Sequence, residues 1–196
     1  MSTRYDLGGR TNQKQRTRAA LIAAARALVA KGVTPTVEDA AEVSAISRTT
    51  AYRYFPNQAE LLAAAHPEIE TVSLLPRDPP SDVVERVAIV VRAFTRTIVQ
   101  TESQQRTMLR LSLEGVARDK LLLRKGRAIA WIEEALEPLR PKLSPKKIRR
   151  LACAIRASIG IEALVWLVDV GGLSRKEALA SMRWSAQAIV RAAIPA

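Results

Sequence analysis

The chain has 196 residues, 48% of them hydrophobic, which is enough apolar material for one or two domains with packed cores. Its 31 Lys and Arg residues against 19 Asp and Glu give a formal charge of +12, which favours nucleic acid as a partner over an anionic membrane surface, unless the charge serves only solubility. The lone Cys153 excludes an internal disulfide, and a polar N-terminus with apolar runs broken at Arg26 and Glu162 predicts neither a leader nor a membrane span, so we expect a cytoplasmic protein.

The sequence predicts an all-α fold, because it has no hairpin signal and no sustained alternation of apolar and polar residues. Residues 1–12 are expected to form a flexible basic arm. A first helix follows over 13–32 and stops at Gly32. Thr36 caps a second helix with Asp39 in a capping box. Ser47 caps a third helix, which Pro56 ends.

Asn57 and Glu60 cap a fourth helix, and the proline-rich stretch "LLPRDPPS" then marks a domain boundary near residue 75. In the second domain, 76–196, Ser81 is the expected cap of the next helix. A short helix is expected over 104–115 and another helix over 121–139. One long helix is expected to start at Ser144 and Pro145 and run to residue 172. Ser174 and Glu177 box the start of the last helix.

Three short helices in this order, with two residues between the second and third, are typical of a helix-turn-helix, whose third helix enters the major groove of DNA. Arg48 is the best candidate for reading a base, because its fork can bond guanine O6 and N7. Tyr52 and Tyr54 can donate to phosphates, although core packing remains an alternative for both, and Phe55 is expected in the core. The remaining candidates for DNA contact are Lys14, Arg16, Arg18, Ser47, Thr49 and Thr50.

The stretch "TVEDAAEVSAISRTTAYRYFPNQAELLAA" resembles the DNA-binding signature of the TetR family of bacterial transcriptional repressors, and the match covers about residues 13–66. The resemblance implies phosphate contact from Thr36 and Tyr52, and base or backbone contact from Ser47, Arg48, Thr49, Thr50 and Tyr54. This chain departs from the family at Ala45, where glycine is usual, so the turn either keeps a left-handed backbone at a cost of about 1 kcal/mol or differs slightly. It departs again at Gln58, where lysine usually clamps a phosphate. Gln58 stays a candidate for DNA contact, because it can donate a hydrogen bond, but it brings no charge.

The resemblance also implies what lies on either side of the proline-rich boundary: a helix-turn-helix domain over 13–75 and a helical effector-binding and dimerisation domain over 76–196. We expect a homodimer on an inverted-repeat operator in double-stranded DNA, most simply a repressor that a small molecule releases. A ligand-independent architectural DNA-binding protein is the alternative, and the choice between repressor and activator stays open. The predicted dimer stripe on the last helix, unless one chain covers both its faces, is Leu179, Met182, Ala186, Ile189 and Ala193.

A mostly apolar effector is expected in the second domain, with an acidic one as the second choice. Glu162 interrupts an apolar run and could orient a ligand, although pairing with Arg156, or facing solvent near the dimer interface, is the simpler expectation. The other candidates, each of which could equally be core, are Phe94, Met108, Trp131, Ile155, Ile159 and Trp166.

An enzyme is not expected. His66 is the only histidine and lies far along the chain from Cys153, and there is no metal-spaced cluster and no glycine-rich phosphate loop. We therefore expect no metal and no cofactor. Of the charged residues, 22 basic and 12 acidic side chains follow residue 70, against 9 and 7 before it, and the sequence gives no reason for this uneven distribution.

Overall fold

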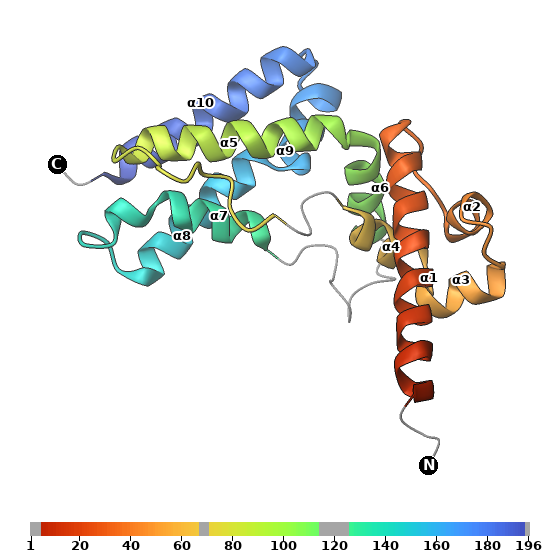
Figure 1. The fold of residues 1–196 in the computed structure, drawn as a ribbon. Helices are drawn as coiled ribbons and strands as arrows, with labels where there is room; N and C mark the ends of the chain where they lie inside the picture. The colour runs from red at the N-terminus through yellow and green to blue at the C-terminus, as the bar shows by residue number, and fades with distance from the viewer. Residues whose placement is uncertain (1–4, 67–70, 114–125, 195–196) are drawn as a thin grey trace. The chain divides into compact units, whose positions relative to one another are not determined.

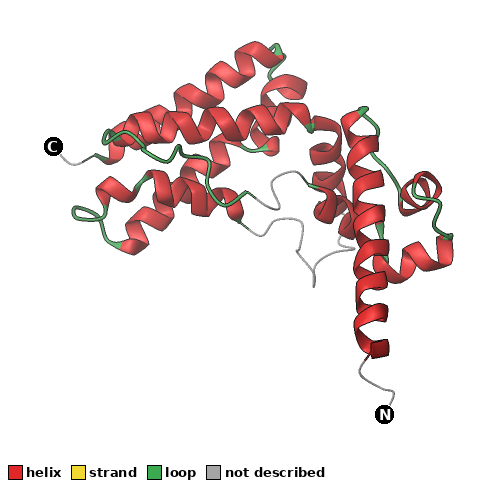
Figure 2. Ribbon diagram, in the orientation of Figure 1, coloured by secondary structure: helices red, strands yellow, loops and turns green. Residues whose placement is uncertain are grey.

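Helices form all the regular secondary structure in the part of the chain that the structure describes, and the all-α prediction is confirmed (Figures 1 and 2). The computed structural model describes residues 5–66, 71–113 and 126–194, with side chains from residue 11 onward. These residues fall into two units. The first contains 5–66 and 110–113, and the second contains 71–109 and 126–194. The chain therefore enters the second unit at Thr71, a few residues before the expected boundary at 75.

The first unit is built on one long helix and three short ones: α1 (Tyr5–Ala30), α2 (Val37–Val43), α3 (Arg48–Tyr54) and α4 (Gln58–Ala65). Helix α1 packs against α2 and α4, and α2 packs against α3. Their shared core contains Leu21, Ala25, Val37, Ala40, Ala41, Ala51, Phe55 and Leu61. Most of these side chains are small, so the four helices approach closely.

The prediction of a flexible arm over 1–12 is wrong for residues 5–12, because α1 already begins at Tyr5. Polar composition suggested an arm, but no proline interrupts this stretch, and its glycines cost a helix only about 1 kcal/mol each.

The second unit contains the remaining helices, in which α5 packs against α7 and α10, and α8 packs against the same two helices (Figure 1). Its core includes Val91, Phe94, Trp131, Ile155 and Met182. The elements are α5 (Val83–Gln100), α6 (Glu102–Leu113), α7 (Arg127–Ala135), the 3-10 turn η3 (Glu137–Leu139), α8 (Pro145–Ile159), α9 (Ile161–Val165), the π-helical turn η4 (Trp166–Val170) and α10 (Arg175–Ala193). The part of α6 after Leu109 belongs to the first unit.

Local capping signals were predicted well, with one error. Ser144 caps α8 with Pro145 as the first helical residue, and Ser174 begins α10 with the capping box to Glu177. The cap of α5 is Asp82, whose carboxylate accepts from the Glu85 N–H at 2.7 Å, and not Ser81 as predicted. Asp and Ser are about equally good caps, so two adjacent candidates cannot be separated by type.

The long helix predicted from Ser144 to residue 172 is wrong, because Gly160 divides it. Gly160 has extended backbone angles, φ −79° and ψ 175°, and is at once the last cap of α8 and the first cap of α9. Glycine is a poor residue for a helix interior and an acceptable first cap, so its position favours such a break.

The run Pro145–Val170 is, by length and composition alone, apolar enough to cross a membrane, with a mean hydropathy of 1.8 over its best 18 residues. The break at Gly160 and the ion pair between Arg156 and Glu162 lie inside this run, and a core helix of a soluble protein passes the same test. About 33% of the window is buried within the chain, and the exposed apolar side chains in the run include Ala154, Ala157, Trp166 and Val170.

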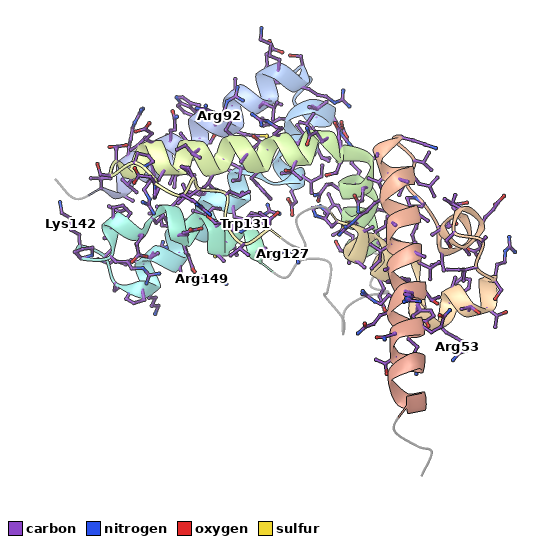
Figure 3. All side chains as sticks on the ribbon, in the orientation of Figure 1. Arg53, Arg92, Arg127, Trp131, Lys142 and Arg149 are labelled. Atoms are coloured by element: carbon purple, nitrogen blue, oxygen red, sulfur yellow. The ribbon has the colours of Figure 1, made fainter. Side chains whose placement is uncertain are left out.

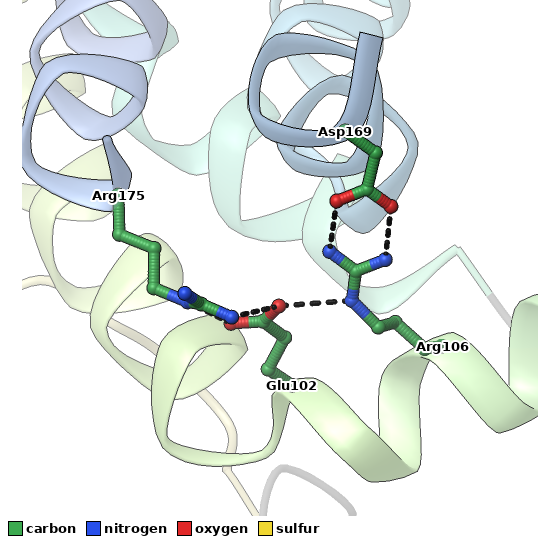
Figure 4. A network of polar contacts seen from close by, with 4 residues as sticks. All are labelled: Glu102, Arg106, Asp169 and Arg175. Carbon is green, nitrogen blue, oxygen red and sulfur yellow. Dashed lines mark hydrogen bonds and ion pairs between the residues drawn. The ribbon is translucent and has the colours of Figure 1, made fainter. Parts of the chain in front are cut away.

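A four-residue ionic network fastens the start of α6 to η4 and to the start of α10 (Figure 4). Arg106 donates two bonds to Asp169, at 2.5 and 2.9 Å, and a third from Nε to Glu102 at 2.8 Å. Arg175 grips the same Glu102 from the other side, at 2.7 and 3.0 Å. These hydrogen bonds lower the pKa of Glu102, chiefly through Arg175, and that of Asp169, chiefly through Arg106.

Candidate nucleic-acid interface

Helix α2 begins with the predicted capping box. Thr36 Oγ1 accepts from the Asp39 N–H at 3.1 Å, and Asp39 Oδ2 accepts from the Thr36 N–H at 2.8 Å. Hydrogen bonds to the Asp39 carboxylate, from the Thr36 backbone N–H first and from the Thr36 side chain second, lower the pKa of the Asp39 carboxyl.

The turn between α2 and α3 keeps the left-handed backbone that glycine usually supplies, although Ala45 occupies it. Ala45 has φ +54°, and no other non-glycine residue of the described chain has a positive φ. Its N–H donates to Glu42 O at 3.1 Å, and the Ile46 N–H donates to Ala41 O at 2.9 Å. This is the Schellman pattern, and the partly buried Ile46 packs against the core next to it. The turn therefore fixes the start of α3 despite its alanine.

The cap of α3 engages two of the residues predicted to contact DNA. Ser47 Oγ accepts from the Thr50 N–H at 3.3 Å and donates to Thr50 Oγ1 at 2.9 Å. Ser47 therefore acts as the N-terminal cap of α3. The bond from Ser47 leaves Thr50, which is half-buried, with its own hydroxyl proton.

Helix α3 is anchored by Ala51 and by Phe55 at its C-terminal cap, both buried, so the prediction that Phe55 is core is confirmed. Its outward face consists of Arg48, Thr49, Tyr52 and Arg53, all exposed. Arg53, labelled in Figure 3, was missed by the sequence reasoning, although it follows Thr49 by four residues and so shares its side of the helix.

Two predicted contact residues lie elsewhere. The Tyr54 ring is half-buried and packs against the core of the first unit, which is the alternative left open for it. Gln58 Nε2 donates to the Pro35 carbonyl at 3.1 Å, so this amide ties α4 to the loop before α2. Gln58 therefore makes a structural contact within the first unit.

The three basic side chains of α1 are all exposed, but they do not share one face. Lys14 and Arg18 are four residues apart and lie on one side of the helix, whereas Arg16 points about 200° away from Lys14. The Arg18 guanidinium lies 5.3 Å from the centre of the Phe55 ring, at the end of α3. Lys14 and Arg18 are thus on the side of α1 that adjoins α3, and Arg16 is not.

The Tyr52 hydroxyl, predicted to bind phosphate, donates to the Glu38 carboxylate of α2 at 2.5 Å. This bond is the largest cause of a lowered pKa at Glu38 and of a raised pKa at Tyr52. Glu38 was not among the predicted site residues, because it is 14 residues from Tyr52 and no local pattern connects them.

The effector candidates divide into core and surface. Phe94, Trp131, Ile155 and Ile159 are in the core of the second unit, with the Phe94 and Trp131 rings edge-to-face at 6.3 Å. Met108 is also buried, whereas Trp166 is 60% exposed, which does not suit the lining of an enclosed cavity.

Glu162 makes the predicted ion pair with Arg156, at 3.3 Å, and the Arg156 guanidinium lies 5.4 Å from the centre of the Phe94 ring. The expectation that Glu162 pairs with Arg156 is confirmed.

The predicted dimer stripe is wrong in register on α10. Met182 and Ala186 are 1% and 0% exposed and belong to the core of their own chain, so they cannot face a second copy. Leu179, Ile189 and Ala193 are partly buried against the same core. The outward side of α10 instead carries Ala180 and Trp184, the latter 71% exposed. On the neighbouring elements the exposed residues include Cys153, Ala154 and Ala157 of α8, and Trp166 and Val170 of η4.

Across the described residues, no three His, Cys, Asp or Glu side chains gather closely enough to hold a metal ion. His66 is buried at the end of α4, and Cys153 lies on the surface of α8.

No protein-family model matches this chain, and no curated protein matches it. The likeness to TetR regulators therefore rests on the residues quoted for it, and the function must be argued from the geometry of the first unit.

Proposed function

We propose that this chain is a sequence-specific DNA-binding regulator of transcription that reads the major groove with α3 in a helix-turn-helix. The observation that carries the proposal is the two-sidedness of α3: Ala51 and Phe55 hold it from behind, while Arg48, Thr49, Tyr52 and Arg53 are exposed in front. A helix fixed at its back and presenting two guanidinium groups at its front has the shape and charge that the major groove accepts.

The side chains divide into those that read bases and those that position the helix. Arg48 is the first residue of α3, and its fork can bond guanine O6 and N7, with a discrimination of about 1–3 kcal/mol. Thr49 beside it can meet a thymine methyl group. Lys14 and Arg18, on the side of α1 next to α3, are suited to phosphates, which fix orientation without reading sequence. The exposed Thr36 is the further phosphate contact that the resemblance implies.

The proposed assembly is a homodimer through the outward side of α8, η4 and α10. Support comes from the apolar run Pro145–Val170, of which only a third of the best window is covered within the chain, and from the exposed Trp166 and Trp184. A second copy would cover these surfaces symmetrically, and Ala154 and Ala157 would let the helices approach closely. Such a dimer reads an inverted repeat with half-sites a whole number of turns apart.

The proposed switch is a small, mostly apolar effector that binds the second unit and releases the protein from its operator. The protein would then be a repressor that acts in the bacterial cytoplasm. The supporting feature is the pair of Phe94 and Trp131 rings in the core of the second unit, with the Arg156 guanidinium over the Phe94 ring and paired with Glu162. A ligand need favour the DNA-free form by only about 1.4 kcal/mol to weaken binding tenfold.

Fluorescence anisotropy with a labelled duplex of random sequence, titrated with salt, tests whether the proposed face binds DNA. Arg53→Ala should weaken binding and reduce the slope of log affinity against log salt by about 1, because one phosphate contact is lost. Lys142→Ala is the matched control, since this exposed cation lies in the second unit, in the loop before α8 (Figure 3). Absence of binding at low salt, or equal losses in both variants, would contradict the proposal.

A further inference from the structure

In the free protein, the Tyr52 hydroxyl is already engaged. Tyr52 on α3 donates to Glu38 Oε1 on α2 at 2.5 Å, and its ring is 40% exposed. Arg48, at the start of α3, lies close enough to lower the pKa values of both groups. Together with the hydrogen bond, this keeps Glu38 ionised at neutral pH, and Tyr52 retains its proton.

A phenol has one O–H to donate, and a DNA phosphate offers only acceptors. Tyr52 can therefore donate to Glu38 or to a phosphate, but not to both. The Glu38 carboxylate is also on the side of α2 that faces α3, where its negative charge opposes the approach of a phosphate.

From these two facts, and resting on the proposed function, we propose that Glu38 is an affinity-limiting residue of the DNA interface. It holds the Tyr52 hydroxyl in the free protein and competes with DNA phosphate for it. Because phosphate contacts carry no sequence information, this competition lowers affinity for all duplexes alike and limits non-specific occupancy.

The test measures binding of a random-sequence duplex to Glu38→Gln by anisotropy, in the native background and in Tyr52→Phe. The matched control is Glu42→Gln, which removes the same charge from an exposed position one turn further along α2. Glu38→Gln should tighten binding about threefold, which is the scale of one exposed hydrogen bond to a charged group after solvent screening. In the Tyr52→Phe background its effect should shrink to that of Glu42→Gln.

Equal effects of Glu38→Gln and Glu42→Gln in both backgrounds would overturn the proposal, since only bulk charge would then matter. Weaker binding by Glu38→Gln would overturn it too, because Glu38 would then be aiming Tyr52 at DNA. Failure of every variant to bind any duplex would refute the proposed function itself, and the competition with it.

A measurement without DNA checks the bond directly. Ultraviolet titration of tyrosine, with Tyr52 assigned by its loss in Tyr52→Phe, should show that Glu38→Gln brings the raised pKa of Tyr52 back down. An unchanged titration would contradict the hydrogen bond on which the competition depends.

Discussion

Replacing Ala45 by glycine should stabilise the protein, although the change removes a methyl group and adds chain entropy. Ala45 is exposed and has φ +54°, so the substitution costs no packing and removes a left-handed conformation from an L-residue. That conformation costs roughly 1–2 kcal/mol. Glycine gives back about 0.4–1 kcal/mol through the greater freedom of the unfolded chain. The expected net gain is about 0.5–1 kcal/mol.

Thermal melting followed by circular dichroism is the assay, with urea titration to check that the m-value is unchanged. For a unit of 60–100 residues, 1 kcal/mol moves the melting temperature by about 4–8 °C, so we expect a rise of about 2–8 °C. The Schellman bonds of Ala45 and Ile46 come from the backbone and persist in the variant.

Two controls isolate the cause. Ala23→Gly, at an exposed position inside α1, should destabilise by about 0.8–1 kcal/mol, the ordinary cost of glycine in a helix. Gly32 follows α1 in the same Schellman pattern, with φ +78°. Gly32→Ala should destabilise the protein by roughly 1 kcal/mol, because it forces an L-residue into the left-handed conformation that Ala45→Gly relieves. A loss of stability in Ala45→Gly like that of Ala23→Gly would refute the reasoning.

Three further changes have definite expected outcomes. Trp184→Glu should convert the proposed dimer to a monomer in analytical ultracentrifugation without lowering stability, because Trp184 is 71% exposed, and an unchanged dimer would exclude this face. Glu102→Gln should lower the free energy of unfolding at pH 7 by about 1–2 kcal/mol, since it breaks bonds to two arginines. Folding lowers the pKa of Glu102, so Glu102 stabilises the folded protein fully above its unfolded pKa of about 4.3, and this stabilisation is lost as the pH falls through its folded pKa. The free energies of unfolding of wild type and variant, measured in urea, should therefore converge near pH 3. Arg48→Ala should leave the melting temperature unchanged and reduce discrimination between duplexes in competition binding, whereas a uniform loss would make Arg48 a phosphate contact.

Features that depend on a few neighbouring residues could be predicted from the sequence. The boxes at Thr36 and Ser174 and the cap at Ser47 formed as expected, because each is a hydrogen bond spanning three residues. The sequence left open whether the turn at Ala45 keeps the left-handed backbone or differs slightly, and the structure has the left-handed form, with φ +54°.

Features that depend on tertiary contacts could not be predicted in the same way. Helix α10 carries alanine on both sides, so the sequence could not tell that Ala186 faces the core while Ala180 faces out. The bond between Glu38 and Tyr52 joins two helices, and it changes which donors are free at the candidate interface. Gly160 could have continued a helix or broken one, and only the packing around it decides.

Selection of bound sequences from a random pool of duplexes tests the central claim most directly, run in parallel on the native protein and on Arg48→Ala. We expect the native protein to enrich an inverted repeat with half-site centres a whole number of helical turns apart. Arg48→Ala should enrich the same repeat with preference lost at one position in each half, because α3 reads bases through that residue. A native pool that shows no enriched sequence would contradict the claim that this protein reads DNA.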